Sequence, residues 1–371
     1  MSRSAVNRRA WPRHLRARLS AFRRRMRRGK VDAMLVTNTV DIRYLTGFRG
    51  DDSWLMVLGR TAIVISDSRF EEELAVTCPY LPTVMRRGLL IDALEPMVRD
   101  RRLRRIGIQA GHTTLRQHDV LVKRLGQRRF KSTVDWLLDQ RTVKDDQELR
   151  HIRRAIRIQQ EAYEVVVGEL KTGVTERAVA ARLDHLMREM GADGPSFETI
   201  VAFDANSSLP HAVPGDTKLC RGGLVLFDFG AKVEGYCSDL TRVVSRGRMA
   251  PKLREIYLIV LAAQHAAISA IRPGVRMKDV DAAARRIIDD AGYGEQFGHG
   301  LGHGIGLEIH EEPSLSPRGK GKLAPGHVVT VEPGIYLPGV GGIRIEDDVL
   351  VTATGRRVLS SLPRDLDSAI I

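Results

Sequence analysis

The chain has 371 residues, a length that predicts about two domains, and its 43% hydrophobic and 28% charged residues are typical of a globular protein. No apolar run approaches the roughly 20 residues that span a bilayer, which argues against an integral membrane protein. Three cysteines cannot form a disulfide framework and indicate a reducing compartment, so we expect the protein in the cytoplasm.

The net charge of +14 is concentrated near the N-terminus. Residues 1–30 contain 12 lysines and arginines and no acidic residue, so the rest of the chain is nearly neutral. Four apolar residues in this segment recur at helical spacing among the arginines: Leu15, Leu19, Phe22 and Met26. We therefore predict a disordered basic tail over residues 1–12 and then the first helix of a folded domain. We expect neither nucleic acid nor a membrane as its partner, although an arginine-rich start also resembles an organelle transit peptide.

Residues 31–140 alternate short apolar strands with helical stretches, which is typical of an α/β domain. The expected strands are 33–37, 54–58, 62–66 and 105–109. No cofactor fingerprint occurs in this part of the sequence. We expect the first domain to cover residues 13–140 and a second domain to cover residues 145–371, with a polar boundary at 140–147.

The second domain contains an internal repeat with an offset of 101 residues. Thr172-Gly173-Val174 matches Pro273-Gly274-Val275, and Gly191 matches Gly292. Each copy is predicted to contain two helices followed by a hairpin, with the first helices at 147–170 and 252–271 and the strands at 223–229, 236–244, 327–332 and 342–351. The repeat predicts a pseudo-twofold domain with a functional site between its halves. A chance similarity between amphipathic helices is the alternative.

One aspartate of the first copy lies inside an apolar strand. Asp228 follows Leu224–Phe227, and burying a carboxylate requires a proton, a cationic partner or a metal. The chain then turns and returns with Asp239, so a hairpin would bring the two carboxylates together. Two close carboxylates repel each other unless a multivalent cation lies between them. A strand-end aspartate in an ordinary turn is the alternative.

The second copy contains a run in which glycine occupies every second position from Gly298 to Gly306. An extended chain would place His299 and His303 on one face with three apolar residues. Only glycine lies on the other face, which another segment must approach closely. The run matches neither a phosphate-binding loop nor the H-E-x-x-H zinc motif.

Two more acids follow in the second copy. Glu332 ends an apolar strand, and period-two alternation places Glu346 on the same face as Arg344. A pseudo-twofold axis would bring these glutamates to Asp228 and Asp239, and His303 would add a nitrogen ligand. Four carboxylates need two divalent ions for charge balance. Oxygen-rich ligands favour Mn²⁺, Fe²⁺ or Co²⁺ and leave Zn²⁺ open, and paired ions are typical of hydrolases such as aminopeptidases.

These residues stand in recognisable motifs. Residues 145–360 resemble the pita-bread metallopeptidase family, which includes methionine aminopeptidase, prolidase and aminopeptidase P. The matching segments are Phe227–Gly230, Ser238–Arg242, Gly302–Gly306, His310-Glu311, Val331–Gly334 and Arg344–Asp347. Residues 1–140 resemble the creatinase/prolidase-type N-terminal domain, with Tyr44–Phe48 as the most recognisable segment. Methionine aminopeptidases lack that domain, so the resemblance indicates the proline-specific branch.

The resemblance implies a role for each matched position. Asp228 would bind one ion, Asp239 and Glu346 would bridge two ions, and His303 and Glu332 would complete the second site. Glu332 would also act as the general base.

Three histidines are implied in substrate binding and catalysis. His211 would bind substrate near the scissile carbonyl, His310 would stabilise the tetrahedral intermediate, and His299 would line the substrate site. A purely structural hydrogen-bonding role is the alternative for each. Arg344 and Thr241 would hold ligand carboxylates, although Arg344 could instead form a surface ion pair.

The expected function is therefore metal-dependent hydrolysis of Xaa-Pro peptide bonds by a hydroxide that bridges two divalent ions, with manganese expected. An Xaa-Pro aminopeptidase is favoured over a dipeptidase, the substrates are proline-containing peptides, and a homodimer is expected from the resemblance. One alternative is a creatinase-like amidinohydrolase, which uses the scaffold without metal ligands. The other is a non-catalytic interaction module, which the basic tail would fit but which has no use for four buried carboxylates.

Overall fold

The computed structural model describes residues 10–371, which divide into two compact units between Gln140 and Arg141. Residues 1–9 of the predicted basic tail lie outside the described residues. The Trp11 ring lies 4.9 Å from the Tyr80 ring. Trp11, near the end of the predicted tail, therefore packs against the first unit. In the part of the chain from residue 10 onward, no helix is long and apolar enough to cross a membrane.

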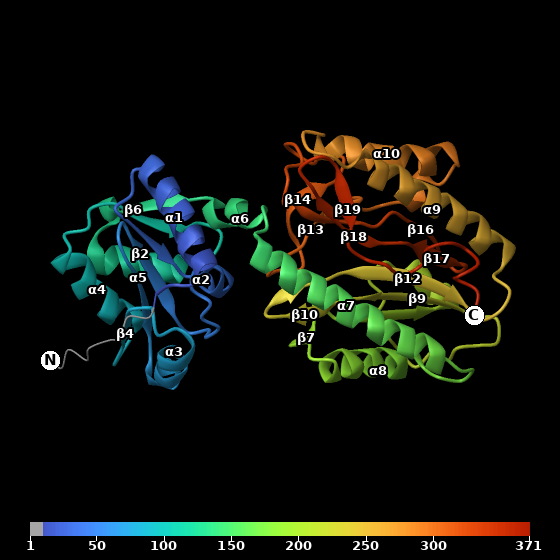
Figure 1. The fold of residues 1–371 in the computed structure, drawn as a ribbon, viewed down its shortest axis with the longest axis horizontal. Coiled ribbons are helices and arrows are strands. Elements are labelled where there is room, and N and C mark those ends of the chain that lie inside the picture. The colour runs from blue at the N-terminus through green and yellow to red at the C-terminus, as the bar shows by residue number, and fades with distance from the viewer. Residues whose placement is uncertain (1–9) are drawn as a thin grey trace. The chain divides into compact units, whose positions relative to one another are not determined.

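The first unit is built around a six-stranded mixed sheet of order β4-β3-β2-β1-β5-β6 (Figure 1). Its strands are β1 (Ala33–Val36), β2 (Trp54–Leu58), β3 (Ala62–Ser66), β4 (Thr83–Met85), β5 (Ile106–Gln109) and β6 (Phe130–Thr133). Its helices are α1 (Arg13–Arg28), α2 (Thr39–Thr46), α3 (Glu71–Thr77), α4 (Leu90–Asp100), α5 (Leu115–Leu125) and α6 (Trp136–Arg141), with short 3-10 helices η1 (Ser68–Phe70) and η2 (Gln127–Arg129). The four strands expected from the sequence are confirmed to within a residue at each end.

The first helix shows why its sequence is so basic. The four apolar residues of its predicted stripe are all buried, and most of its arginines lie at least partly exposed around them. The expected amphipathic helix is therefore confirmed as α1.

The second unit contains four long helices and four small sheets. Its helices are α7 (Asp146–Glu169), α8 (Glu176–Glu189), α9 (Pro251–Ala270) and α10 (Met277–Asp290), with 3-10 helices η3 (Asp204–Ser208) and η4 (Gly294–Gln296). The strands of its first half are β7 (Gly194–Pro195), β8 (Ile200–Phe203), β9 (Leu224–Phe229), β10 (Ala231–Val233), β11 (Tyr236–Cys237) and β12 (Leu240–Ser245). Those of its second half are β13 (Gly302–Gly304), β14 (Glu311–Leu315), β15 (Val328–Val331), β16 (Gly334–Leu337), β17 (Gly341–Arg344), β18 (Asp347–Val351) and β19 (Arg356–Val358).

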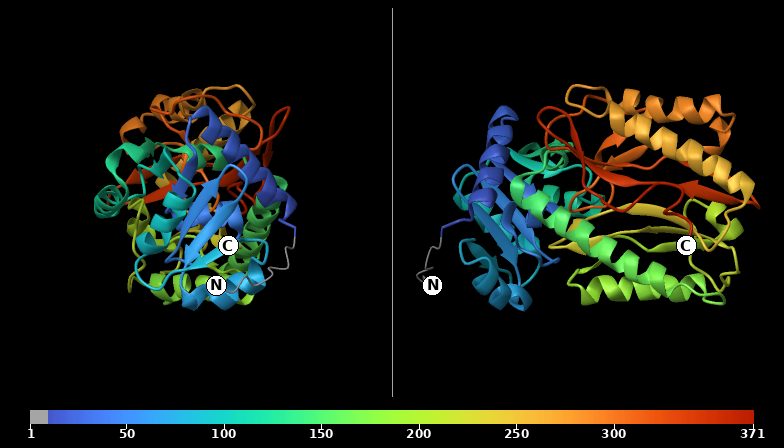
Figure 2. Two further views of the ribbon diagram at one scale, coloured as in Figure 1. Left: turned by 90° about the vertical axis from the view of Figure 1, so that its left-hand side faces the viewer. Right: turned by 45° about the vertical axis from the view of Figure 1, so that its right-hand side comes forward.

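The residues of β9 that precede Asp228 are apolar, and they are buried on both faces of the strand. In β9, Val225 and Phe227 pack in a core with α7 and α8, whereas Leu224 and Leu226 pack in a second core with α9 and α10. Figure 2 shows the two helix pairs on opposite sides of the strands. The sheets thus form a layer between the helix pairs, and the strand ends within this layer are available to position a site.

Two sequence predictions for the second half need correction. The strand expected over 342–351 is broken into β17 and β18, because β17 pairs with β16 while β18 pairs with β15. Glu346 therefore lies in the break between two sheets.

The glycine-alternating run is also not one extended strand, because only Gly302–Gly304 forms β13 and its pairing with β14 shifts register. The expected close approach to the glycines is confirmed at two positions. A Cβ atom on Gly302 would lie 2.1 Å from the Thr330 carbonyl oxygen, and one on Gly304 would lie 2.2 Å from that of Glu312. Since side chains at these positions would collide with backbone, the glycines allow β14 and β15 to pack closely around His303.

Candidate active site

A cavity of about 770 Å³ opens among the strand ends of the second unit. Its lining contains every residue predicted as a metal ligand and all three predicted substrate histidines: Asp228, Asp239, His303, Glu332, Glu346, His211, His299 and His310. Arg344 also lines it, whereas Thr241 is fully buried beside it. The structure thus brings together residues that are up to 135 positions apart in the chain.

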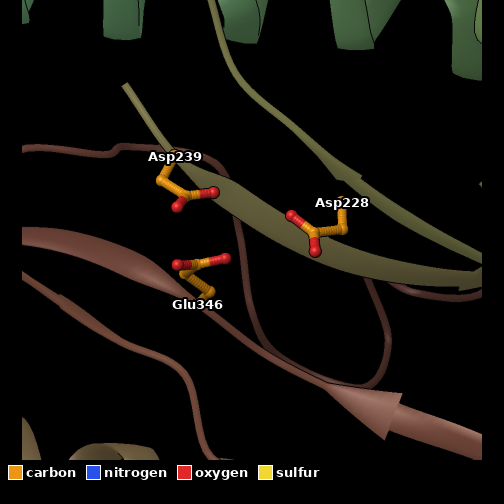
Figure 3. A group of neighbouring side chains, drawn as sticks. All are labelled: Asp228, Asp239 and Glu346. Carbon is orange, nitrogen blue, oxygen red and sulfur yellow. The ribbon is translucent and has the colours of Figure 1, made fainter. Parts of the chain in front are cut away.

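Three carboxylates form the centre of the cavity. Asp228 lies on β9, Asp239 immediately precedes β12, and Glu346 lies between β17 and β18. One oxygen from each lies within 4.8 Å of the others, and Figure 3 shows the carboxylates facing one another. The Glu346 amide donates to the Thr241 carbonyl oxygen at 3.2 Å, which ties the second half to β12 at this point.

His303 and Glu332 adjoin this group. The Nε2 atom of His303 lies 3.3 Å from Oε1 of Glu332 and 3.6 Å from Oδ2 of Asp239. The Nδ1 atom of His303 lies 3.1 Å from the Gly304 carbonyl oxygen, a contact that requires a proton on Nδ1 and leaves the Nε2 lone pair directed at the carboxylates. Because burial lowers the pKa of His303, its imidazole is neutral and suited to bind a metal.

The Thr330 hydroxyl orients both of these residues. It donates to Oε1 of Glu332 at 3.1 Å and accepts from the His303 amide at 3.0 Å. One side chain of β15 therefore fixes the nitrogen ligand and its neighbouring carboxylate together.

Among the described residues, too little positive charge and too few hydrogen-bond donors surround Asp239, Glu332 and Glu346 to stabilise their ionised form. Burial raises the pKa of Asp239 and of Glu346 well above the ordinary range, and the neighbouring carboxylates add to the effect. Burial also raises the pKa of Glu332 to about 7. Among residues 10–371, Oδ1 of Asp239 and Oε1 of Glu346 are buried without a hydrogen-bond partner. Buried oxygens without donors are costly, so four carboxylates and one neutral imidazole fit divalent metal ions.

Arg344 and Thr241 hold the carboxylates from behind. Arg344 is 3% exposed, so it is not a surface ion pair, and its Nη2 atom donates to Oδ2 of Asp228. Its Nε atom donates to the Thr241 hydroxyl at 3.0 Å. That hydroxyl donates in turn to Oε2 of Glu346 at 2.7 Å. A single chain of hydrogen bonds therefore joins the carboxylates of the two halves.

The three histidines differ in their surroundings. The His310 ring lies 4.5 Å from the His303 ring in an edge-to-face arrangement, and burial together with His303 and His211 lowers its pKa. His211 is exposed and lines the same cavity. His299 is fixed at both nitrogens, by the Gly300 carbonyl oxygen at 2.8 Å and the Tyr336 hydroxyl at 3.0 Å. Burial lowers the pKa of His299 to about 4, so that ring is neutral at pH 7.

The sequence pattern missed two residues of this site. The Tyr336 hydroxyl accepts from Nη1 of Arg344 at 2.6 Å and contacts His299, and it thereby joins a ligand support to a substrate-site histidine. The fully buried Asp348 accepts a hydrogen bond from the Asp239 amide at 3.2 Å. The run of three acidic residues Glu346–Asp348 between two apolar strands was the available signal for Asp348, whereas nothing in the sequence marked Tyr336.

Comparisons with known proteins agree with this geometry. Residues 150–353 match metallopeptidase family M24, and residues 18–143 match the creatinase/prolidase N-terminal domain. The chain is 36% identical over 344 residues to an Xaa-Pro dipeptidase of Pyrococcus horikoshii, which covers 92% of this chain and 96% of the relative.

Solved structures give the same result. An Xaa-Pro dipeptidase from Bacillus anthracis is similar with a TM-score of 0.91 and 36% identity, covering 95% of this chain and 99% of that one. An X-Pro aminopeptidase from Thermotoga maritima is similar with a TM-score of 0.87 and 38% identity, covering 92% and 99%. The resemblance and the fold class expected from the motifs are thereby confirmed. The chain is a member of metallopeptidase family M24 with a creatinase/prolidase-type N-terminal domain.

Proposed function

We propose that this protein hydrolyses the bond between an N-terminal residue and a following proline, using two divalent metal ions. The observation that carries the proposal is the group of four carboxylates and one neutral imidazole that lines a substrate-sized cavity. The names of the similar proteins, Xaa-Pro dipeptidase and X-Pro aminopeptidase, support the choice of substrate.

In this proposal each ligand residue has a defined place. Asp228 would hold one ion, His303 and Glu332 would hold the other, and Asp239 and Glu346 would be shared between them. Manganese is the ion we expect, because carboxylate-rich sites suit it. When bound, a pair of divalent ions supplies a nucleophilic water of lowered pKa and polarises the substrate carbonyl.

In this proposal, side chains of the cavity transfer the proton and stabilise the negative charge that develops during the reaction. Glu332 lies at the cavity wall, where its carboxylate can accept a proton from the attacking water and return it to the proline nitrogen as that group leaves. His310 and His211 line the same cavity and can donate hydrogen bonds to the oxyanion that develops on the carbonyl. His299, held by Tyr336, would shape the substrate site and not exchange protons.

The charges of the cavity favour an aminopeptidase over a strict dipeptidase. A dipeptide carries a free carboxylate next to the scissile bond, and such groups are usually bound by a permanent cation. Among the described residues that line the cavity, Arg344 is the one lysine or arginine, and it is buried and engaged by Asp228, Thr241 and Tyr336. We infer that the enzyme does not require the carboxylate and accepts longer peptides.

The test compares three substrates with added Mn²⁺: Ala-Pro, its amide Ala-Pro-NH₂, and Ala-Pro-Ala. We expect kcat/KM for the amide and the tripeptide to equal or exceed that for Ala-Pro. Turnover of Ala-Pro alone would make the enzyme a dipeptidase and refute the carboxylate argument. Hydrolysis of Ala-Ala-Ala with none of the proline substrates cleaved would refute the proline specificity itself.

We further infer a homodimer that works in the cytoplasm. The dimer is supported by the resemblance to the proline-specific branch. The compartment is supported by the three cysteines, all free, of which Cys78 and Cys237 are buried. Sedimentation equilibrium of the purified protein tests the dimer, and a single species of about 41 kDa would contradict it.

A further inference from the structure

The residue that follows His310 is a buried carboxylate outside the metal-ligand group. The side chain of Glu311, at the start of β14, is 1% exposed. Two cations from the segment before α7 surround it, and their side chains are also buried: Arg141 is 2% exposed and Lys144 is fully buried. Burying three charged groups costs free energy, and replacing such a cluster with apolar residues is often neutral or stabilising. Stability alone therefore does not explain why these charges are buried.

Both oxygens of Glu311 are bound. Nη2 of Arg141 donates to Oε1, and Nζ of Lys144 donates to Oε2 at 3.0 Å. Burial opposes ionisation, but Lys144 and Arg141 outweigh it and hold the pKa of Glu311 below its usual range. The carboxylate is therefore a fixed anchor.

Arg141 also binds the other end of the same loop. Its Nη2 atom donates to Oε2 of Glu308 at 2.6 Å, and the Glu308 amide donates back to Oε1 of Glu311 at 3.2 Å. Glu308 and Glu311 flank Ile309 and His310, so one guanidinium pins both ends of the turn that carries His310.

The cations are held in turn by backbone. Nζ of Lys144 donates to the Arg141 carbonyl oxygen at 2.7 Å, and the Lys144 amide donates to the Gly326 carbonyl oxygen at 2.9 Å. The anchor thus joins the start of the second unit to the loop just before β15.

His310 depends on this turn for its position. Within residues 10–371, no atom hydrogen-bonds its ring, which packs edge to face on the His303 ring. We propose that Arg141, Lys144 and Glu311 are positioning residues that hold His310 at the oxyanion side of the cavity. This inference rests on the proposed peptidase activity.

The first test is Arg141→Lys, which keeps the charge but replaces the planar guanidinium, whose Nη2 atom reaches Glu308 and Glu311 together, with a single tetrahedral ammonium group. We expect kcat for Ala-Pro-Ala to fall roughly 10- to 100-fold, since a small misplacement of a catalytic group has effects of this order. KM should stay within about threefold and two ions per chain should remain, because neither the ligands nor the substrate contacts change. Glu308→Gln removes the charge of the partly exposed Glu308 and so weakens only its contact with Arg141; it should lower kcat several-fold and guards against misfolding of the first variant.

A double-mutant cycle with His310→Ala decides whether the effect passes through that histidine. We expect Arg141→Lys and Glu308→Gln to have no further effect on kcat in the His310→Ala background. Arg182→Lys changes an exposed ion pair with Glu169 outside the cavity lining and should leave kcat unchanged in both backgrounds. Additive losses of kcat, or full activity of both anchor variants, would overturn the inference. An inactive wild-type protein with two bound ions would instead overturn the proposed function.

Discussion

Replacing Thr241 with valine removes one hydroxyl group while keeping the shape of the side chain. That hydroxyl is fully buried, donates to Oε2 of Glu346 at 2.7 Å and accepts from Nε of Arg344 at 3.0 Å. A hydrogen bond to a charged group contributes about 1.5–3 kcal/mol. Since about 1.4 kcal/mol corresponds to tenfold in affinity, we expect Thr241→Val to weaken metal binding roughly 10- to 100-fold, as usually occurs when a residue that orients a metal ligand is changed.

The measurement is a titration of the metal-free protein with Mn²⁺ in competition with a chelator. Thr241→Ser is the matched control, because it retains the hydroxyl and should bind within about threefold of wild type. Excess Mn²⁺ should restore most activity to Thr241→Val, since the loss is in affinity. Wild-type affinity in the valine variant, or an equal loss in the serine variant, would refute the role of the hydroxyl.

The remaining predictions concern three other residues. Glu346→Ala should lose both ions and nearly all activity, because this carboxylate would be shared between the ions; full occupancy by atomic emission would contradict that assignment. His310→Ala should keep both ions and lose roughly 10²-fold or more in kcat with a smaller change in KM; loss of an ion would make this histidine a ligand. Burial lowers the pKa of His327 to about 4, so its folded state favours the neutral ring, and stability present above pH 6.5 is lost as the pH falls toward 4. His327→Gln should remove about 2 kcal/mol of the loss seen at pH 5, measured by urea denaturation at pH 5 and 7, and an unchanged pH dependence would show that this ring does not titrate on unfolding.

The spacing of apolar residues predicts many helices and strands of this fold, because the burial of a single element depends mainly on its own sequence. The stripe of α1 and the apolar run of β9 each reflect burial of one element, and burial follows directly from residue spacing. The hairpin that joins Asp228 to Asp239 is also local: β9 and β12 pair in a continuous register that sets Asp228 opposite Thr241. The first half of the site is therefore readable from the sequence.

The second half is harder to predict because its geometry depends on pairings between distant segments. Alternation alone continues a strand through Ile345 and Glu346, whereas β17 leaves to pair with β16. That hairpin is also what brings Tyr336 to Arg344. The contact between Arg141 and Glu311 spans 170 residues, and no local spacing records it.

The ligand group is divided between the two halves of the second unit. Asp228 and Asp239 precede α9, whereas His303, Glu332 and Glu346 follow α10, so neither half alone has the donors for two ions. With the ligands proposed above, both ions would be bound only after the halves have docked, and a chain whose halves dock out of register would lack the complete metal site. Peptidase activity would therefore depend on metal binding, and metal binding on correct assembly of the two halves, so that no active site would exist before the second unit has folded.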